Sequence, residues 1–216
     1  MKPDKLKRAA QSGFSLVELM IVLVILSIVF AVVASGIKSL QNRNTAEVSK
    51  KDIEQTTRDF LDQSVRDIHQ AGYPSAKMVT GGTCAPNSLA CGITFFDPNG
   101  NQIIFEADTN GDGTIEQETI RLVGADGVTV GGACPCTVQR GSVAKGTAGA
   151  PPYYSELGNV INIGIFSGYD SGGTATTTPA NIKTVRMTVN VQGNDPDPTT
   201  KQLPVVSMTA QARITN

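Results

Sequence analysis

The sequence predicts an α+β protein in which a long N-terminal helix precedes an antiparallel β-sheet domain. Two patterns predict this fold. Residues 14–33 form an apolar run with a single charge, Glu18, and as a helix this run spans about 30 Å, the thickness of a bilayer core. Helical spacing of apolar residues then continues to residue 68, and strict apolar–polar alternation follows in residues 185–191 and 206–214.

A short basic segment precedes the apolar run. Residues 1–13 hold four basic side chains and one acidic side chain, a net charge of +3, which predicts that they stay in the cytoplasm. A secretory signal peptide has a shorter apolar stretch followed by a small-residue cleavage site, whereas here the small residue, Gly13, comes before the run. We therefore expect residues 14–38 to cross the inner membrane once, with the C-terminal part exported.

Residues 39–73 form the expected second, amphipathic half of the same helix. Their apolar positions recur every three or four residues, with charged residues largely between them, so one helix face packs on a domain. No proline interrupts residues 14–73, so one continuous helix is expected. Ser35-Gly36 is its expected weak point. The helix is expected to end at Gly72, which Pro74 soon follows. The face expected to be buried consists of Ile53, Thr57, Phe60, Leu61, Val65 and Ile68.

The segment Gly13-Phe14-Ser15-Leu16-Val17-Glu18, behind a basic leader and ahead of an apolar helix, resembles the N-terminus of type IV prepilins and type II secretion pseudopilins. The resemblance implies that a prepilin peptidase/methyltransferase removes the leader by cutting between Gly13 and Phe14, and then N-methylates Phe14. It also implies that Glu18 of one subunit meets the Phe14 amine of a neighbour during filament assembly. A carboxylate among apolar helices needs such an opposite charge.

The helix end, Asp67-Ile68-His69-Gln70-Ala71-Gly72-Tyr73, resembles that of PilW-like minor pilins. Many major pilins carry a single C-terminal cysteine pair, which this chain lacks. The resemblance implies a pilin-like fold and a non-enzymatic minor pilin that helps initiate or cap pilus assembly and moves from the inner membrane to the pilus on the cell surface. Its implied partners are other major and minor pilins and the inner-membrane assembly platform. A minor pseudopilin of the type II secretion tip and a pilus-displayed adhesion or binding module, presenting loop 167–181, are the alternatives.

Residues 74–216 form the expected exported, β-rich domain. Its loops are expected where glycine, threonine, proline and alanine gather, at residues 131–152, 167–181 and 193–202. Between and around these loops the expected strands are residues 93–96, 102–107, 118–123, 160–166, 182–191 and 206–214.

One segment of this domain has the pattern of a calcium site. Residues 108–116 match the first half of a calcium loop, with oxygen-bearing side chains at alternate positions and a glycine for the sharp turn. The match then fails, because the final glutamate is required at Thr119 and Glu118 stands one residue early. A hairpin turn uses the same residue types, so both interpretations stay open. No cofactor is required, and calcium is the only one suggested, with Asp108, Asn110, Asp112, Thr114 and Glu116 or Glu118 as ligands.

Four cysteines lie on the exported side, where oxidation is expected: Cys84, Cys91, Cys134 and Cys136. Cys84 could pair with Cys91 and Cys134 with Cys136, or both of the last two could staple their loop to the Cys84 segment. Sequence alone does not choose. The C-x6-C and C-x-C spacings do not suit zinc.

Composition excludes other functions. Beyond residue 13 the chain has 14 basic side chains (18 minus 4) and 18 acidic ones (19 minus 1), a net charge of −4 without a basic cluster. This argues against nucleic-acid binding as a main function. His69 is the only histidine, and no phosphate loop, zinc-protease motif or nucleophile elbow is present in the sequence. We therefore expect no enzymatic activity.

Overall fold

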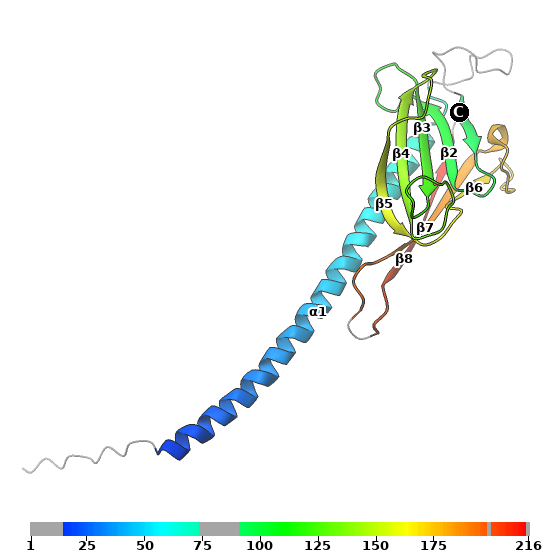
Figure 1. Ribbon diagram of the computed structural model, residues 1–216. Coiled ribbons are helices and arrows are strands. Elements are labelled where there is room, and N and C mark those ends of the chain that lie inside the picture. Colours follow the sequence, from blue (N-terminus) through cyan, green and yellow to red (C-terminus); the bar gives the residue numbers. More distant parts are fainter. Residues whose placement is uncertain (1–14, 74–90, 198–199, 215–216) are drawn as a thin grey trace, which may run out of the picture. The chain divides into compact units, whose positions relative to one another are not determined.

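The computed structural model of the protein describes residues 15–73, 91–197 and 200–214 (Figure 1). The chain divides into two compact units, Met1–Thr45 and Ala46–Asn216. One helix, α1 (Leu16–His69), contributes its first part to the N-terminal unit and its last part to the second unit. The α+β class is confirmed, because the last part of α1 packs against an antiparallel sheet.

Within the second unit, α1 is amphipathic as its sequence predicts. Thr57, Phe60, Leu61 and Ile68 are buried, and Ile53 and Val65 are partly buried beside them. The helix also ends as predicted. Gly72 adopts a positive φ of 87°, the left-handed conformation that terminates helices, and its N–H donates to the carbonyl oxygen of Glu106 at 2.8 Å.

Eight antiparallel strands form one sheet. Seven of them follow the order β1-β2-β3-β4-β5-β7-β6, and β8 pairs with the edge of β7 that β5 and β6 leave free. Neighbouring strands β1 to β5 follow chain order, as hairpins do. β7 pairs along its whole length with β8 and shares its other edge between β6 and the end of β5. The bounds are β1 Gly92–Phe96, β2 Gln102–Ala107, β3 Glu116–Val123, β4 Cys136–Ala144, β5 Tyr153–Val160, β6 Phe166–Tyr169, β7 Thr184–Gln192 and β8 Val205–Arg213, with a short 3-10 helix η2 at Pro179–Asn181.

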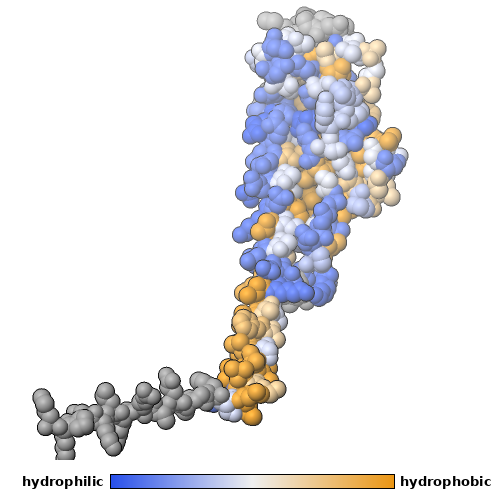
Figure 2. Space-filling view, turned by 60° about the vertical axis from the view of Figure 1, so that its left-hand side comes forward, coloured by the Kyte–Doolittle hydropathy of each residue, from blue (hydrophilic) through white to orange (hydrophobic). Residues whose placement is uncertain are grey.

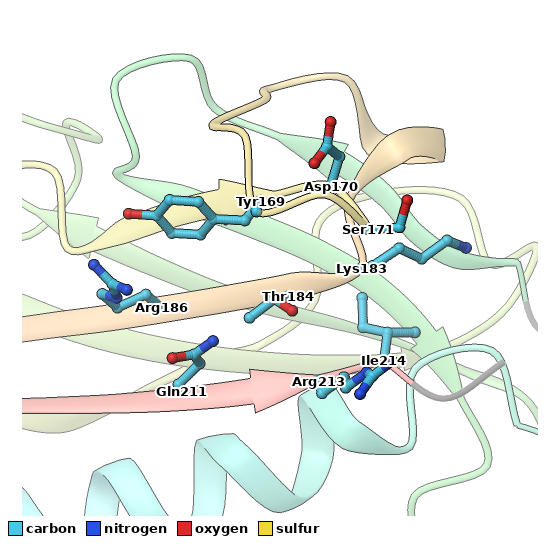
Figure 3. A pocket seen from close by; sticks show the side chains of 10 residues that line it. Tyr169, Asp170, Ser171, Lys183, Thr184, Arg186, Gln211, Arg213 and Ile214 are labelled. Atoms are coloured by element: carbon cyan, nitrogen blue, oxygen red, sulfur yellow. The ribbon is translucent and has the colours of Figure 1, made fainter.

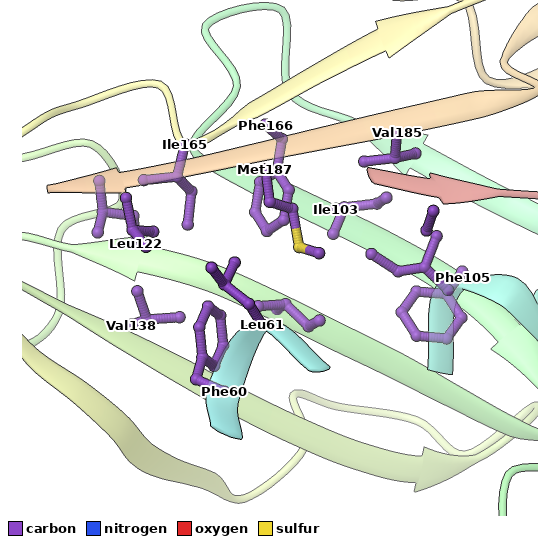
Figure 4. Packing of buried hydrophobic residues seen from close by; sticks show 14 of the residues in the cluster. Phe60, Leu61, Ile103, Phe105, Leu122, Val138, Ile165, Phe166, Val185 and Met187 are labelled. Carbon is purple, nitrogen blue, oxygen red and sulfur yellow. The ribbon is translucent and has the colours of Figure 1, made fainter. Parts of the chain in front are cut away.

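The sheet curls so that its β1–β2 hairpin reaches β6. The N–H of Phe166 donates to the carbonyl oxygen of Gly100, in the β1–β2 turn, at 2.9 Å. Gly100 has a φ of 71°, and a Cβ there would lie 2.2 Å from the Phe166 carbonyl oxygen, so only glycine fits. β1 also contacts η2. This closure encloses one core in which Phe60 and Leu61 of α1 lie among side chains of β2, β3, β4 and β7 (Figure 4).

The predicted strands at 93–96, 102–107, 118–123, 182–191 and 206–214 correspond to β1, β2, β3, β7 and β8. Three other predictions are wrong. The loop predicted at 131–152 contains β4, and the loop predicted at 167–181 begins inside β6. The strand predicted at 160–166 is largely irregular chain between β5 and β6, with Ile161 and Ile163 exposed and Gly164 at a φ of 69°. The loop at 193–202 is confirmed over its described residues.

Candidate processing and assembly segment

Glu18 stands in the first turn of α1, which begins at Leu16. The N–H of Leu19 donates to the carbonyl oxygen of Ser15 at 3.1 Å, so regular helix surrounds the carboxylate. A negative charge is favoured at this end, where free backbone N–H groups give the helix a partial positive charge. Glu18 is exposed and takes part in no ion pair with a described residue. Gly13 and Phe14, the predicted cleavage and methylation positions, lie outside the described residues.

The helix beyond Glu18 presents a continuous apolar surface. Every large hydrophobic side chain from Leu16 to Val33 is 49–75% exposed, and this part of α1 is long and apolar enough to cross a membrane. Hydrophobic residues cover its visible surface, whereas hydrophilic residues predominate elsewhere on the visible face (Figure 2). A surface of this kind needs lipid or other apolar helices around it.

The few polar groups in this stretch are satisfied inside the helix. The hydroxyls of Ser27 and Ser35 donate to the carbonyl oxygens of Val24 and Val32, each at 2.8 Å. Such bonds let serine sit in an apolar helix without a free donor. The helix also continues through Ser35-Gly36, so the predicted weak point does not interrupt it. Between residues 15 and 37, Glu18 is the one charged side chain in the sequence.

Another acidic residue of α1, Asp67, is buried in an ionic cluster that the sequence did not reveal. Arg140 of β4 forms an ion pair with Asp67 and donates from Nε to Glu156 Oε1 of β5 at 2.6 Å. Its Nη2 donates to Ser64 Oγ at 3.2 Å. Burial opposes the charge of Arg140, but Glu156 and Asp67 outweigh it and raise the pKa of Arg140. The cluster ties the end of the helix to the middle of the sheet.

Glu118 of β3 lies on the same side of the sheet as Arg140, since Glu118 pairs with Ser142 and Ile120 with Arg140. Its Oε2 is buried and has no hydrogen-bond partner among the residues that the structure describes. Burial raises the pKa of Glu118 above its ordinary value of 4.5. Because its carboxylate is buried, Glu118 resembles the members of the ionic cluster more than it resembles an exposed calcium ligand.

The loop suggested as a calcium site joins β2 to β3, which pair from Ala107 opposite Glu116. The hairpin interpretation of this loop is therefore confirmed. Asp108 accepts hydrogen bonds from the N–H groups of Gly111 and Gly113 at 2.7 and 3.0 Å. These are the bonds by which aspartate shapes a turn.

The other proposed calcium ligands also bond within the loop. Asp112 accepts from the N–H of Thr114 at 2.7 Å, and the amide of Asn110 donates to Asp112 and Glu116 at 3.0 and 3.1 Å. Over the described ranges, no three His, Cys, Asp or Glu side chains gather into a group that could hold a metal. Calcium binding stays a prediction.

The cysteines of the described residues are all oxidised. Cys134 and Cys136 form a disulfide with each other, which is one of the two arrangements that the sequence left open. Cys91 is disulfide-bonded, and Cys84 lies outside the described residues. His69 is exposed, and its Nδ1 lies 2.6 Å from the carbonyl oxygen of Arg213, so it joins the end of α1 to β8.

Comparison with known proteins recognises the N-terminal segment. Residues 8–34 match the family model described as the prokaryotic N-terminal methylation motif. The matched range includes Gly13, Phe14 and Glu18 and ends inside the exposed apolar part of α1. No curated protein and no solved structure matches the chain. The motif implies processing by a prepilin peptidase and association with a membrane, and it indicates a structural protein. The chain thus carries an N-terminal methylation motif on a helix that can cross a membrane, and this supports a type IV prepilin-like protein.

Proposed function

We propose that the protein is a minor type IV pilin. A prepilin peptidase cuts after Gly13 and methylates Phe14, and the processed subunit helps initiate or cap a pilus through its N-terminal helix. The observation that carries this proposal is the pairing of the methylation motif at residues 8–34 with an apolar helix surface that no part of the described chain covers. Neighbouring pilin helices and lipid are the partners that suit such a surface.

The charge arrangement supports assembly rather than simple anchoring. A carboxylate in the hydrocarbon region costs about 3 kcal/mol, and an anchor would gain nothing from it. Cleavage after Gly13 creates an amine on Phe14, one helical turn before Glu18. Each subunit then brings one cation and one anion to the same depth, and a neighbour's amine can neutralise Glu18 when helices pack side by side.

The experiment compares three forms of the chain in cells that lack the native protein: wild type, Glu18→Ala, and the matched control Ser27→Ala on the same exposed helix. Mass spectrometry of the membrane-purified protein reads the N-terminus, and electron microscopy counts surface pili. We expect methylated Phe14 in all three forms, and pili with wild type and Ser27→Ala but not with Glu18→Ala. Glu18 then acts after processing.

Two results contradict the proposal. An unprocessed N-terminus in the wild type removes the prepilin assignment altogether. Normal pili in cells that lack the protein, combined with loss of exported enzymes from the medium, assign it to a type II secretion system as a minor pseudopilin instead.

A further inference from the structure

The outward face of β6, β7 and β8 carries a hollow of about 540 Å³ that three cationic residues help to line (Figure 3). They come from separate places in the sequence: Lys183 precedes β7, Arg186 lies in β7, and Arg213 ends β8. The remaining lining is mostly neutral and polar, including Ser171, Thr184 and Gln211. A volume of this size falls within the range of small-ligand sites, roughly 300–1,000 Å³.

The cations of this hollow have no anionic partner among the described residues. The ion pairs of the described chain involve Arg140 and Lys145, which lie elsewhere. Of the described residues that line the hollow, Asp170 is the only one with a carboxylate. Its Oδ1 accepts the N–H groups of Gly172 and Thr174 at 2.8 and 2.9 Å, so it shapes a turn. The hollow is therefore a net cationic site on a chain whose net charge beyond residue 13 is −4.

Strand pairing fixes the backbone that carries these cations. The register places Arg186 opposite Gln211, and Thr184 between Tyr169 and Arg213. The guanidinium of Arg186 stacks over the Tyr169 ring, with 4.9 Å from Cζ to the ring centroid, which is within cation–π range. Backbone bonds of 2.8 Å from Lys183 N–H to the Tyr169 carbonyl and from Ile214 N–H to the Lys183 carbonyl fix the rim.

We propose that this hollow binds an acidic saccharide, a hydroxyl-rich ring that carries a carboxylate. Arg186, Arg213 and Lys183 supply charge-assisted donors for the carboxylate. The side chains of Thr184, Ser171 and Gln211 both donate and accept hydrogen bonds, as sugar hydroxyls require. The lining also has apolar parts, which include the side chains of Tyr169 and Ile214. This inference concerns the second compact unit and does not depend on pilus assembly.

The test uses the full-length protein in mild detergent and isothermal titration calorimetry. Trigalacturonate is the acidic probe, maltotriose the neutral probe, and a hexaglutamate peptide the acidic protein-like probe. The variants are Arg186→Gln and Arg213→Gln, with Arg58→Gln on the exposed face of α1 as the charge-matched control. Near-UV circular dichroism checks that each variant is folded, and Lys183→Gln replaces any variant that is not.

We expect trigalacturonate to bind the wild type and maltotriose not to bind. Each hollow variant should weaken binding about tenfold or more, because a hydrogen bond to a charged group contributes at least that factor, whereas Arg58→Gln should bind as the wild type does. The proposal is overturned if the wild type gives no heat with trigalacturonate or if maltotriose binds equally. It is also overturned if Arg58→Gln loses as much as the hollow variants, or if hexaglutamate binds as tightly, which would assign the site to an acidic protein segment.

Discussion

Replacing Arg140 by methionine should destabilise the folded domain strongly, because Arg140 is the only described cation of a buried ionic cluster. It is 15% exposed and bonds Asp67, Glu156 and Ser64 at once. Methionine has a similar length without the charge. The substitution therefore leaves the carboxylate of Asp67, 9% exposed, and that of Glu156, 27% exposed, facing a core without a cation.

The size of the effect follows from how far each carboxylate is buried. Removing one partner of a fully buried ion pair costs about 3–5 kcal/mol. Asp67 is close to that limit but keeps a 2.7 Å hydrogen bond from Gln63 Nε2, and Glu156 is exposed enough to recover part of its hydration. We therefore expect Arg140→Met to lower the free energy of unfolding by about 3 kcal/mol, near the lower end of that range.

Urea unfolding of the full-length protein in mild detergent, followed by the near-UV circular dichroism of its tyrosines, measures this change. The control is Arg58→Met on the exposed face of α1, which should shift stability by less than about 0.5 kcal/mol. In the double variant Asp67→Leu with Arg140→Met, much of the loss should be recovered, because the most deeply buried uncompensated charge is gone. A loss below about 1 kcal/mol for Arg140→Met, the value of an exposed ion pair, would refute the reasoning.

Two further predictions concern carboxylates of the same domain. Glu118→Gln should raise the free energy of unfolding at pH 7 by about 1 kcal/mol, because burial raises the pKa of Glu118 and ionisation costs the folded state stability as the pH rises through that pKa. Urea unfolding at pH 7 and pH 4 checks it, since the gain should disappear at the lower pH; an equal gain at both values contradicts it. For Asp126, the Thr129 hydroxyl and the N–H groups of Val128 and Thr129 lower the pKa to about 2, so its stabilising effect is present above its ordinary pKa of 3.8 and is lost as the pH falls through about 2. Thr129→Val should move the pKa of Asp126 toward 3.8 in an NMR titration, and an unchanged value would show that the hydroxyl is not the cause.

The sequence predicted β7 because the buried face of this strand is uniformly apolar. β7 alternates Val185, Met187, Val189 and Val191 inward, and the period-two pattern identified it. β4 was missed because Arg140 occupies an inward position next to Val138, so its pattern did not alternate between apolar and polar residues. The ionic cluster that explains this exception involves residues far apart in the sequence, and a pattern within one strand cannot show it.

The error at residues 160–166 has a different cause. Ile161, Ile163 and Ile165 alternate correctly, but only Ile165 is buried. The segment runs beside β7 through bonds that do not form a continuous ladder: Ile161 N–H donates to the Asn190 carbonyl and Asn162 Nδ2 to the Thr188 carbonyl, each at 2.9 Å. Alternation of apolar and polar residues shows only that a segment could form a strand. Whether it does depends on continuous backbone hydrogen bonding to a neighbouring strand.

Asp67 and Glu18 are acidic residues on apolar faces of α1, and they contribute to different processes, Asp67 to folding and Glu18 to the proposed assembly. Asp67 and Glu18 both interrupt an apolar pattern, yet Asp67 finds its cation within the chain, on β4, and Glu18 pairs with no described residue. The cost of a desolvated carboxylate is the same in kind at both positions. Asp67 is therefore satisfied once the second unit folds, whereas Glu18 can be satisfied in an apolar setting only by a cation that arrives from outside the described chain. In the proposed pilin, the methylated amine of a neighbour's Phe14 supplies that cation, so the same physical cost that fixes α1 to its own sheet at one end drives subunits together at the other.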